Sequence, residues 1–169
     1  MPAAPSNRDY EGGFAAAMML KGFTAQYLLR RVYKVQAGDT ILFHAAAGGV
    51  GTIATQWAKS LGVRVIGTVS TREKAELAKA NGCAEVIITS EENIVERVKE
   101  LTDGKGVPVV YDSVGKATFV DSLNCLKPRG MMVSFGNASG KVDPVPLQWL
   151  AERGSLVLTR PTVASFTVD

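Results

Sequence analysis

The residues best suited to chemistry are the glycines of segment 45–51, which reads Ala-Ala-Ala-Gly-Gly-Val-Gly. Ala46, Gly48 and Gly51 follow the spacing of the dinucleotide fingerprint, with alanine in place of its first glycine. Gly48 has no Cβ to keep a pyrophosphate from the backbone, and Gly51 would let the next helix pack closely on a strand. The amides and positive dipole end of that helix would face the phosphates. The segment therefore predicts a phosphate-binding turn, although glycine-rich stretches also form ordinary loops.

The end of the following predicted strand indicates which dinucleotide would fit. Sites specific for NAD place Asp or Glu there, to accept a hydrogen bond from the ribose 2′-hydroxyl. Segment 67–74 reads Gly-Thr-Val-Ser-Thr-Arg-Glu-Lys, so no carboxylate ends this strand. Ser70 and Thr71 can donate hydrogen bonds to a 2′-phosphate, and Arg72 or Lys74 can supply positive charge. The pattern favours NADPH over NADH, unless both cations are simply solvated charges on a helix surface.

Two further segments place small and polar residues where strands are expected to end. Ser113 follows one predicted strand, and Phe135, Gly136 and Asn137 follow the next. The carboxyl ends of parallel strands meet at one edge of a sheet, where such folds bind ligands. Phe135 would supply an apolar wall and Asn137 an amide, although each segment taken alone also suits an ordinary turn. The agreement of three strand ends favours one extended ligand.

The histidine and the cysteines indicate no metal chemistry. His44 is the only histidine and ends a predicted buried strand, where a structural role is more common than a catalytic one. Cys83 and Cys125 lie in or beside apolar segments and lack metal-ligand spacing, so we expect buried free thiols. A zinc site in this chain is therefore not expected. No acid–base pair stands out, and we predict neither a catalytic residue nor a metal ligand.

Composition is typical of one globular domain. The chain has 169 residues, is 46% hydrophobic and carries a formal net charge of +3. Lysine and arginine are interspersed with acidic residues, so no basic stripe indicates a nucleic-acid partner. The apolar stretch 14–20 is too short to span a bilayer and lacks a signal-peptide layout. We therefore expect a cytoplasmic protein with no membrane partner.

Hydrophobic patterning predicts the elements that position these residues. Residues 1–39 would form a loose leader and two short helices, 9–19 and 21–33, separated near Gly22. From residue 40, short runs rich in Val and Ile alternate with amphipathic segments, as in parallel sheets covered on both faces. The predicted strands are 40–44, 64–69, 85–88, 108–112, 131–135 and 155–159, and the predicted helices are 50–61, 72–81, 92–101, 116–125 and 147–153.

These elements define the expected fold class. We predict an α/β fold over 40–169, with a doubly wound, parallel, six-stranded Rossmann sheet and helices on both faces. Glycines that follow helical segments, among them Gly62 and Gly130, are expected to cap those helices. The last strand carries apolar residues at 156–158, so an uncovered edge would favour a homodimer.

Together the motifs resemble the quinone oxidoreductase (zeta-crystallin-like) branch of the medium-chain dehydrogenase/reductase superfamily. The resemblance covers nearly the whole chain and rests on segments 21–25, 44–51, 70–74, 110–115 and 134–137. It implies an NADPH-dependent, zinc-independent reductase of quinones or related electron-poor alkenes and carbonyls. It also implies a homodimer formed by pairing of the last strand.

The resemblance further implies roles for individual residues. Lys74 would meet the 2′-phosphate of NADPH, with Ser70 as a second contact. Thr89 stands where the family often has a tyrosine, so an aromatic contact beside the adenosine phosphate is lost. The implied pyrophosphate contacts are Ala46, Gly48, Gly49, Val50 and Gly51. The implied ribose and nicotinamide contacts are Thr24, Ser113, Phe135, Gly136 and Asn137.

The resemblance also implies that this is the cofactor-binding domain only. Full-length relatives begin with a substrate domain, so we expect an incomplete substrate pocket and little activity from this chain alone. Two other functions stay open. One is an NADPH-dependent enoyl or enone reductase of the same superfamily, and the other is a non-enzymatic, zeta-crystallin-like role in RNA binding or structure. The net charge of +3 is a weak footprint for RNA.

Overall fold

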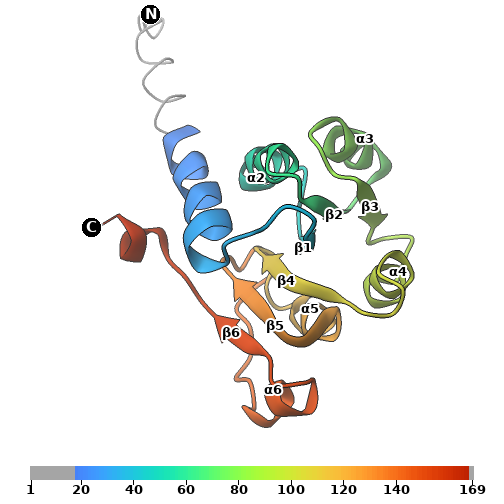
Figure 1. Cartoon of the computed structure of the whole chain (residues 1–169), viewed down its shortest axis with the longest axis vertical. Helices are drawn as coiled ribbons and strands as arrows, with labels where there is room; N and C mark the ends of the chain where they lie inside the picture. The colour runs from blue at the N-terminus through green and yellow to red at the C-terminus, as the bar shows by residue number, and fades with distance from the viewer. Residues whose placement is uncertain (1–17, 168–169) are drawn as a thin grey trace, which may run out of the picture.

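The computed structural model describes residues 18–167 and contains a single parallel sheet (Figure 1). Its six strands follow the order β3-β2-β1-β4-β5-β6, and every pairing is parallel. This is the strand order of a Rossmann fold. Strands are added toward one edge of the sheet from β1 to β3 and toward the other edge from β4 to β6, so the order reverses between β1 and β4. The predicted fold class is confirmed. The leader and most of the predicted helix 9–19 lie outside the described residues.

Most predicted elements are present, with shifted ends. The strands are β1 (Thr40–Phe43), β2 (Arg64–Val69), β3 (Glu85–Ile88), β4 (Val107–Asp112), β5 (Leu126–Ser134) and β6 (Val157–Thr159). The helices are α2 (Gly49–Ser60), α3 (Arg72–Ala80), α4 (Ile94–Leu101), α5 (Phe119–Asn124), α6 (Gln148–Glu152) and the short 3-10 helix η2 (Val163–Phe166). Gly62 follows α2 with a φ of 75°, as expected for a helix cap.

One continuous helix replaces the predicted break near Gly22. Residues 18–27 are α-helical and lead directly into the π turn η1 (Leu28–Val32); we call residues 18–32 the first helix. Among the described residues, and apart from its chain neighbours and the backbone of its own helix, no atom lies within 4 Å of the position of a Cβ on Gly22, so this glycine marks neither a turn nor a close contact. Packing offsets its low helix propensity, because Ala25 and Leu28 are fully buried.

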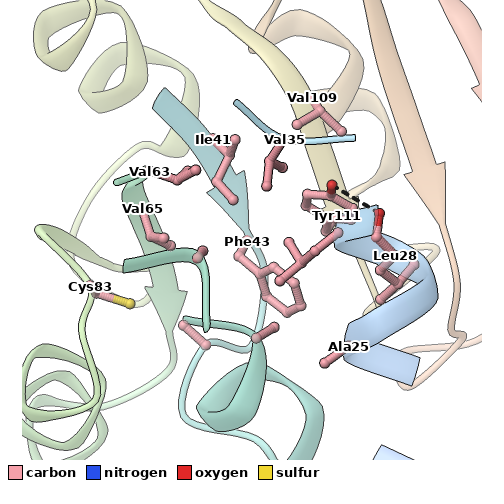
Figure 2. Close-up of a cluster of buried hydrophobic side chains, with 14 of the residues drawn as sticks. Ala25, Leu28, Val35, Ile41, Phe43, Val63, Val65, Cys83, Val109 and Tyr111 are labelled. Carbon is pink, nitrogen blue, oxygen red and sulfur yellow. Dashed lines mark hydrogen bonds between the residues drawn. The ribbon is translucent and has the colours of Figure 1, made fainter. Parts of the chain in front are cut away.

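Helices cover both faces of the sheet, which explains why its strands are apolar throughout. In β1, Ile41 and Phe43 face one core and Leu42 faces the other. Residues of the first helix, α2 and α3 close the first core, and residues of α4, α5 and α6 close the second (Figure 1). Figure 2 shows Phe43 and Tyr111 of the first core between the strands and the first helix.

The fifth strand is longer than predicted, and Gly130 does not cap a helix. β5 begins at Leu126, and Gly130 lies within it. Its neighbour Arg129 adopts the left-handed conformation instead, with a φ of 62°. A Cβ on Gly130 would lie 2.8 Å from the carbonyl oxygen of Lys127, so a close backbone approach requires the glycine. The polar residues around Pro128 made this segment look like a turn, whereas it is the irregular start of a strand.

Candidate cofactor-binding site

The glycine turn joins β1 to α2 and leaves the start of that helix uncapped. The N-cap residue of α2 is Gly48, which offers no side-chain hydrogen bond, and the first turn holds no acidic residue. By contrast, the side chains of Thr71 and Asn93 cap α3 and α4, and each of those helices has an acid in its first turn. The amides and positive dipole end of α2 are therefore suited to an external anion.

Backbone contacts explain why this turn needs its glycines. A Cβ on Gly51 would lie 2.5 Å from the carbonyl oxygen of Ala45 and 2.6 Å from that of Ala46. The close packing of helix on strand that we predicted for Gly51 is therefore present. A Cβ on Gly48 would lie 3.0 Å from the same oxygen of Ala45, and both Gly48 and Gly49 are exposed. A ligand can thus approach this backbone closely.

A cavity of about 620 Å³ opens beside the turn, along the carboxyl ends of β1, β2, β3 and β4. It contains three of the predicted site residues, Gly48, Ser70 and Lys74. Ala46 is fully buried and Gly51 is buried, so these two residues shape the backbone of the turn without lining the cavity. The other lining residues are Ala45, Ala47, Thr68, Val69, Thr89, Glu92, Asn93, Ile94, Val114, Ala117, Thr118 and Asp121.

The end of β2 presents a lysine to this cavity. The Lys74 amino group donates a hydrogen bond to the Ser70 hydroxyl at 3.3 Å. Arg72, the other predicted cation, pairs with Glu91 at 2.8 Å, and this interaction raises the pKa of the guanidinium. The Thr71 hydroxyl accepts a hydrogen bond from the Lys74 amide and caps α3. Of the four candidates at this strand end, Ser70 and Lys74 therefore line the cavity.

A second cavity of about 420 Å³ lies between the first helix, the ends of β4 and β5, and the segment after β6. It brings together four predicted residues that are far apart in the sequence, Thr24, Val50, Ser113 and Phe135. Our sequence prediction missed Lys21, Tyr27 and Arg160, which also line it. Lys21 and Tyr27 each lie one helical turn from Thr24, and this spacing could have indicated both.

The last two predicted residues, Gly136 and Asn137, line neither of these cavities. Asn137 lines a third hollow of about 320 Å³, together with Ser134 and Arg160. Gly136 makes a close backbone contact, because a Cβ there would lie 2.5 Å from the carbonyl oxygen of Ser113. Gly136 thus allows the chain segments that follow β4 and β5 to touch, at the edge of the second cavity.

A buried network of hydrogen bonds connects the carboxyl ends of β1, β2 and β4 with α5. His44 is fully buried, with Nδ1 2.9 Å from the Thr68 hydroxyl and Nε2 2.9 Å from the Ser122 hydroxyl. The Ser122 hydroxyl donates to a carboxylate oxygen of Asp112 at 2.9 Å. Burial lowers the pKa of His44, and the nearby charge of Asp112 opposes that shift only in part. A neutral, doubly hydrogen-bonded imidazole fits the structural role that we predicted.

Asp112 fixes the turn between β4 and α5. Its carboxylate accepts hydrogen bonds from the amides of Val114 and Gly115, at 2.7 and 3.0 Å, and from the hydroxyl of Thr118 at 2.7 Å. Residues 113–118 therefore form a rigid turn, and α5 begins at Phe119 instead of residue 116. Since this turn lines both cavities, Asp112 is a positioning residue that our prediction missed. An aspartate at a strand end is the signal for such a turn.

The thiols and acidic groups indicate no metal centre in the described part of the chain. Within residues 18–167, no group of three or more His, Cys, Asp and Glu side chains could hold a metal ion. Cys83 and Cys125 are buried and free, as predicted, and burial raises the pKa of their thiols to about 11 and about 12. Over the same residues, no helix is long and apolar enough to cross a membrane.

A Rossmann sheet with an uncapped glycine turn between β1 and α2 places this chain in the class of nucleotide-binding α/β domains. More narrowly, the chain belongs to the zinc-binding dehydrogenase family, whose model matches residues 49–168.

Its relatives include quinone oxidoreductases. The chain is 60% identical to a quinone oxidoreductase of Pseudomonas aeruginosa over 96% of its own length, and 52% identical to a 2-haloacrylate reductase of Burkholderia over 94%. Among solved structures, quinone oxidoreductase of Escherichia coli complexed with NADPH superimposes with a TM-score of 0.90 at 52% identity, covering 99% of this chain and 50% of that one. The chain covers 49% and 48% of the first two relatives, which is about half of their length.

Proposed function

We propose that this chain is the NADPH-binding part of a zinc-independent quinone oxidoreductase. The observation that carries the proposal is the meeting of an uncapped glycine turn and a carboxylate-free strand end in one cavity of about 620 Å³, with Lys74 in its wall. The turn suits a pyrophosphate and the lysine suits a 2′-phosphate, so the residues fit this cofactor. The NADPH bound to the 52% identical E. coli enzyme supports the same choice.

The residues of this chain would bind and orient the cofactor. When bound, NADPH supplies a hydride for reduction of a quinone, or of a related electron-poor alkene or carbonyl. Lys74 and Ser70 would hold its 2′-phosphate, and the turn around Gly48 would hold its pyrophosphate. In the second cavity, the ring of Phe135 would form an apolar wall that excludes water from the nicotinamide. We assign no acid or base in this chain, because a reduced quinone can take its proton from solvent.

A second candidate substrate has a specific observation in its favour. The 52% identity to a Burkholderia 2-haloacrylate reductase favours an activated alkene as the hydride acceptor. Quinones and such alkenes both accept hydride at an electron-poor π system, so the same cofactor site serves either. Comparing the two substrate types in one assay would distinguish the candidates.

We further propose that residues 40–169 form the cofactor domain, and residues 1–39 its connection to a substrate domain, in a cytoplasmic homodimer. Two buried free cysteines suit the reducing cytoplasm. β6 lies at one edge of the sheet, and Val157 on it is 46% exposed. An apolar edge strand favours pairing with a second copy. Light scattering should give a dimer, and a monomer at high concentration would contradict the pairing.

A chimeric enzyme tests the catalytic proposal. The matching half of the P. aeruginosa quinone oxidoreductase would be replaced by this chain, to which it is 60% identical. We expect the chimera to oxidise NADPH with 1,4-naphthoquinone, and the same assay with 2-chloroacrylate would test the second candidate. A chimera that folds and binds NADPH but reduces neither acceptor would contradict the proposed activity.

A further inference from the structure

The side chain of Lys21 lies across the phosphate-binding turn. If Gly49 carried a Cβ, that atom would lie 2.7 Å from Cε, 3.0 Å from Cδ and 3.1 Å from Nζ of Lys21. A side chain at this position would therefore displace the end of Lys21 from the turn. This contact connects the first helix to the start of α2.

The first helix holds Lys21 in this place. Ala25 and Leu28 follow Lys21 at four and seven residues, so all three lie on one face of the helix. Ala25 and Leu28 are fully buried, and the Tyr111 hydroxyl donates to the Leu28 carbonyl oxygen at 3.2 Å (Figure 2). Lys21 therefore points toward the body of the domain, whereas the next residue along the chain with a large side chain, Phe23, is 52% exposed.

The electrostatic environment of the Lys21 amino group favours the binding of an anion beside it. Over residues 18–167, its amino group forms no ion pair or hydrogen bond. It also lies beside the positive end of the α2 dipole, where a cation is disfavoured unless negative charge binds between them. Lys21 lines the second cavity and touches Gly49, next to Gly48 in the first cavity. It thus stands where a ligand that fills both cavities must cross from one to the other.

We propose that Lys21 is a cofactor-contacting residue that neutralises the pyrophosphate of the dinucleotide, opposite the amides of α2. This inference rests on the proposed function. It divides the charges of the cofactor between two lysines: Lys21 meets the pyrophosphate, and Lys74 meets the 2′-phosphate. The amino group of Lys21 would thereby also hold the first helix, and with it Thr24, against the bound cofactor.

Two ligands separate the roles of the two lysines. Isothermal titration would compare NADPH with adenosine 2′-monophosphate, which carries the 2′-phosphate but no pyrophosphate. The variants are Lys21→Met, Lys21→Gln, Lys21→Arg and Lys74→Met. The matched control is Lys105→Met, because Lys105 is exposed in the turn before β4, at the opposite end of the strands. Thermal unfolding would be recorded for each variant, and Lys21→Gln serves if Lys21→Met does not fold.

We expect Lys21→Met and Lys21→Gln to weaken NADPH binding about 10- to 100-fold, since charge-assisted hydrogen bonds are lost, and to leave adenosine 2′-monophosphate unaffected. Lys21→Arg should retain most of the affinity, and Lys74→Met should weaken both ligands. The role of Lys21 would be overturned if Lys21→Met and Lys21→Gln both bound NADPH with wild-type affinity. It would also be overturned if they lost affinity equally for NADPH and for adenosine 2′-monophosphate. Either result would leave the proposed function intact. A wild-type chain that binds no NADPH would overturn both.

Discussion

The amino group of Lys74 donates a hydrogen bond to the Ser70 hydroxyl at 3.3 Å, across the junction of β2 and α3. Both side chains line the larger cavity, whereas Arg72 forms an ion pair with Glu91 on the segment after β3. A single strand end thus carries two cations with different tasks. One faces the cavity, and the other ties two neighbouring segments together.

This division predicts that Arg72→Ala has little effect on the cofactor. Arg72 pairs with Glu91, and its side chain is 79% exposed, so solvent screens this pair. Because Arg72 does not line the larger cavity, we expect the NADPH dissociation constant, measured by titration calorimetry, to change by less than about threefold. A loss as large as that caused by Lys74→Ala would show that Arg72 also binds the phosphate.

The contacts of Gly51 predict a large loss of stability on adding one methyl group. In Gly51→Ala the new Cβ would meet two backbone oxygens at 2.5 and 2.6 Å, and neither can move without shifting the turn. Overpacking of this kind costs about 1–3 kcal/mol in the free energy of unfolding, which urea titration measures.

The matched control is Gly22→Ala. That position has open space inside a helix, so the substitution should stabilise the protein by about 0.5–1 kcal/mol. A neutral Gly51→Ala would contradict the close contact between α2 and the end of β1.

The buried imidazole predicts a pH-dependent stability. Burial lowers the pKa of His44 in the folded protein, so below about pH 6.5 the unfolded chain binds more protons than the folded one. The free energy of unfolding should therefore fall as the pH drops from about 7 to 5.5, by up to about 1.4 kcal/mol per pH unit. Urea titrations across this range measure the slope.

His44 is the only histidine of the sequence, which makes the slope assignable. A His44→Gln variant should be less stable at neutral pH, because the amide cannot reproduce both hydrogen bonds, but its stability should vary much less between pH 7 and 5.5. A slope that persists in this variant would contradict the assignment.

The four hydrogen bonds accepted by Asp112 predict a linked loss of stability and cofactor affinity. In Asp112→Asn an amide donor would face groups that donate to the native carboxylate, such as Ser122 and Thr118. We expect a cost of about 1–3 kcal/mol in unfolding free energy and weaker NADPH binding, because the turn 113–118 loosens. The control is Asp103→Asn, since Asp103 is exposed in the turn before β4, at the opposite end of the strands. Unchanged NADPH affinity in Asp112→Asn would contradict a positioning role.

The sheet was predictable because its signals are local. Uniformly apolar runs predict strands, the glycine turn predicts the connection from β1 to α2, and Gly62 predicts the end of α2. Each of these signals lies within the segment whose structure it predicts. Where a local signal pointed elsewhere, tertiary packing decided the outcome. Pro128 and Arg129 resemble a turn but begin β5, and Gly22 resembles a break but lies inside a helix held by Ala25 and Leu28.

The site was predictable at its strand ends and less so elsewhere. Parallel strands bring Gly48, Ser70 and Ser113 to one edge wherever the fold forms, so spacing alone could group them. Its spacing from Thr24 could have placed Lys21 on the same side of the first helix, but its contact with Gly49 depends on how that helix packs against β4, through Leu28 and Tyr111. The role of Arg72 likewise depends on Glu91, which lies on another strand connection.

The central claim is that this chain carries a site for NADPH that distinguishes it from NADH through Lys74. Isothermal titration of the purified chain with both dinucleotides, and with a Lys74→Ala variant, tests it most directly. We predict that NADPH binds at least about tenfold more tightly than NADH, and that Lys74→Ala removes most of this preference, since a charge-assisted contact to the 2′-phosphate is lost. Equal affinities of the wild-type chain for NADPH and NADH would contradict the account.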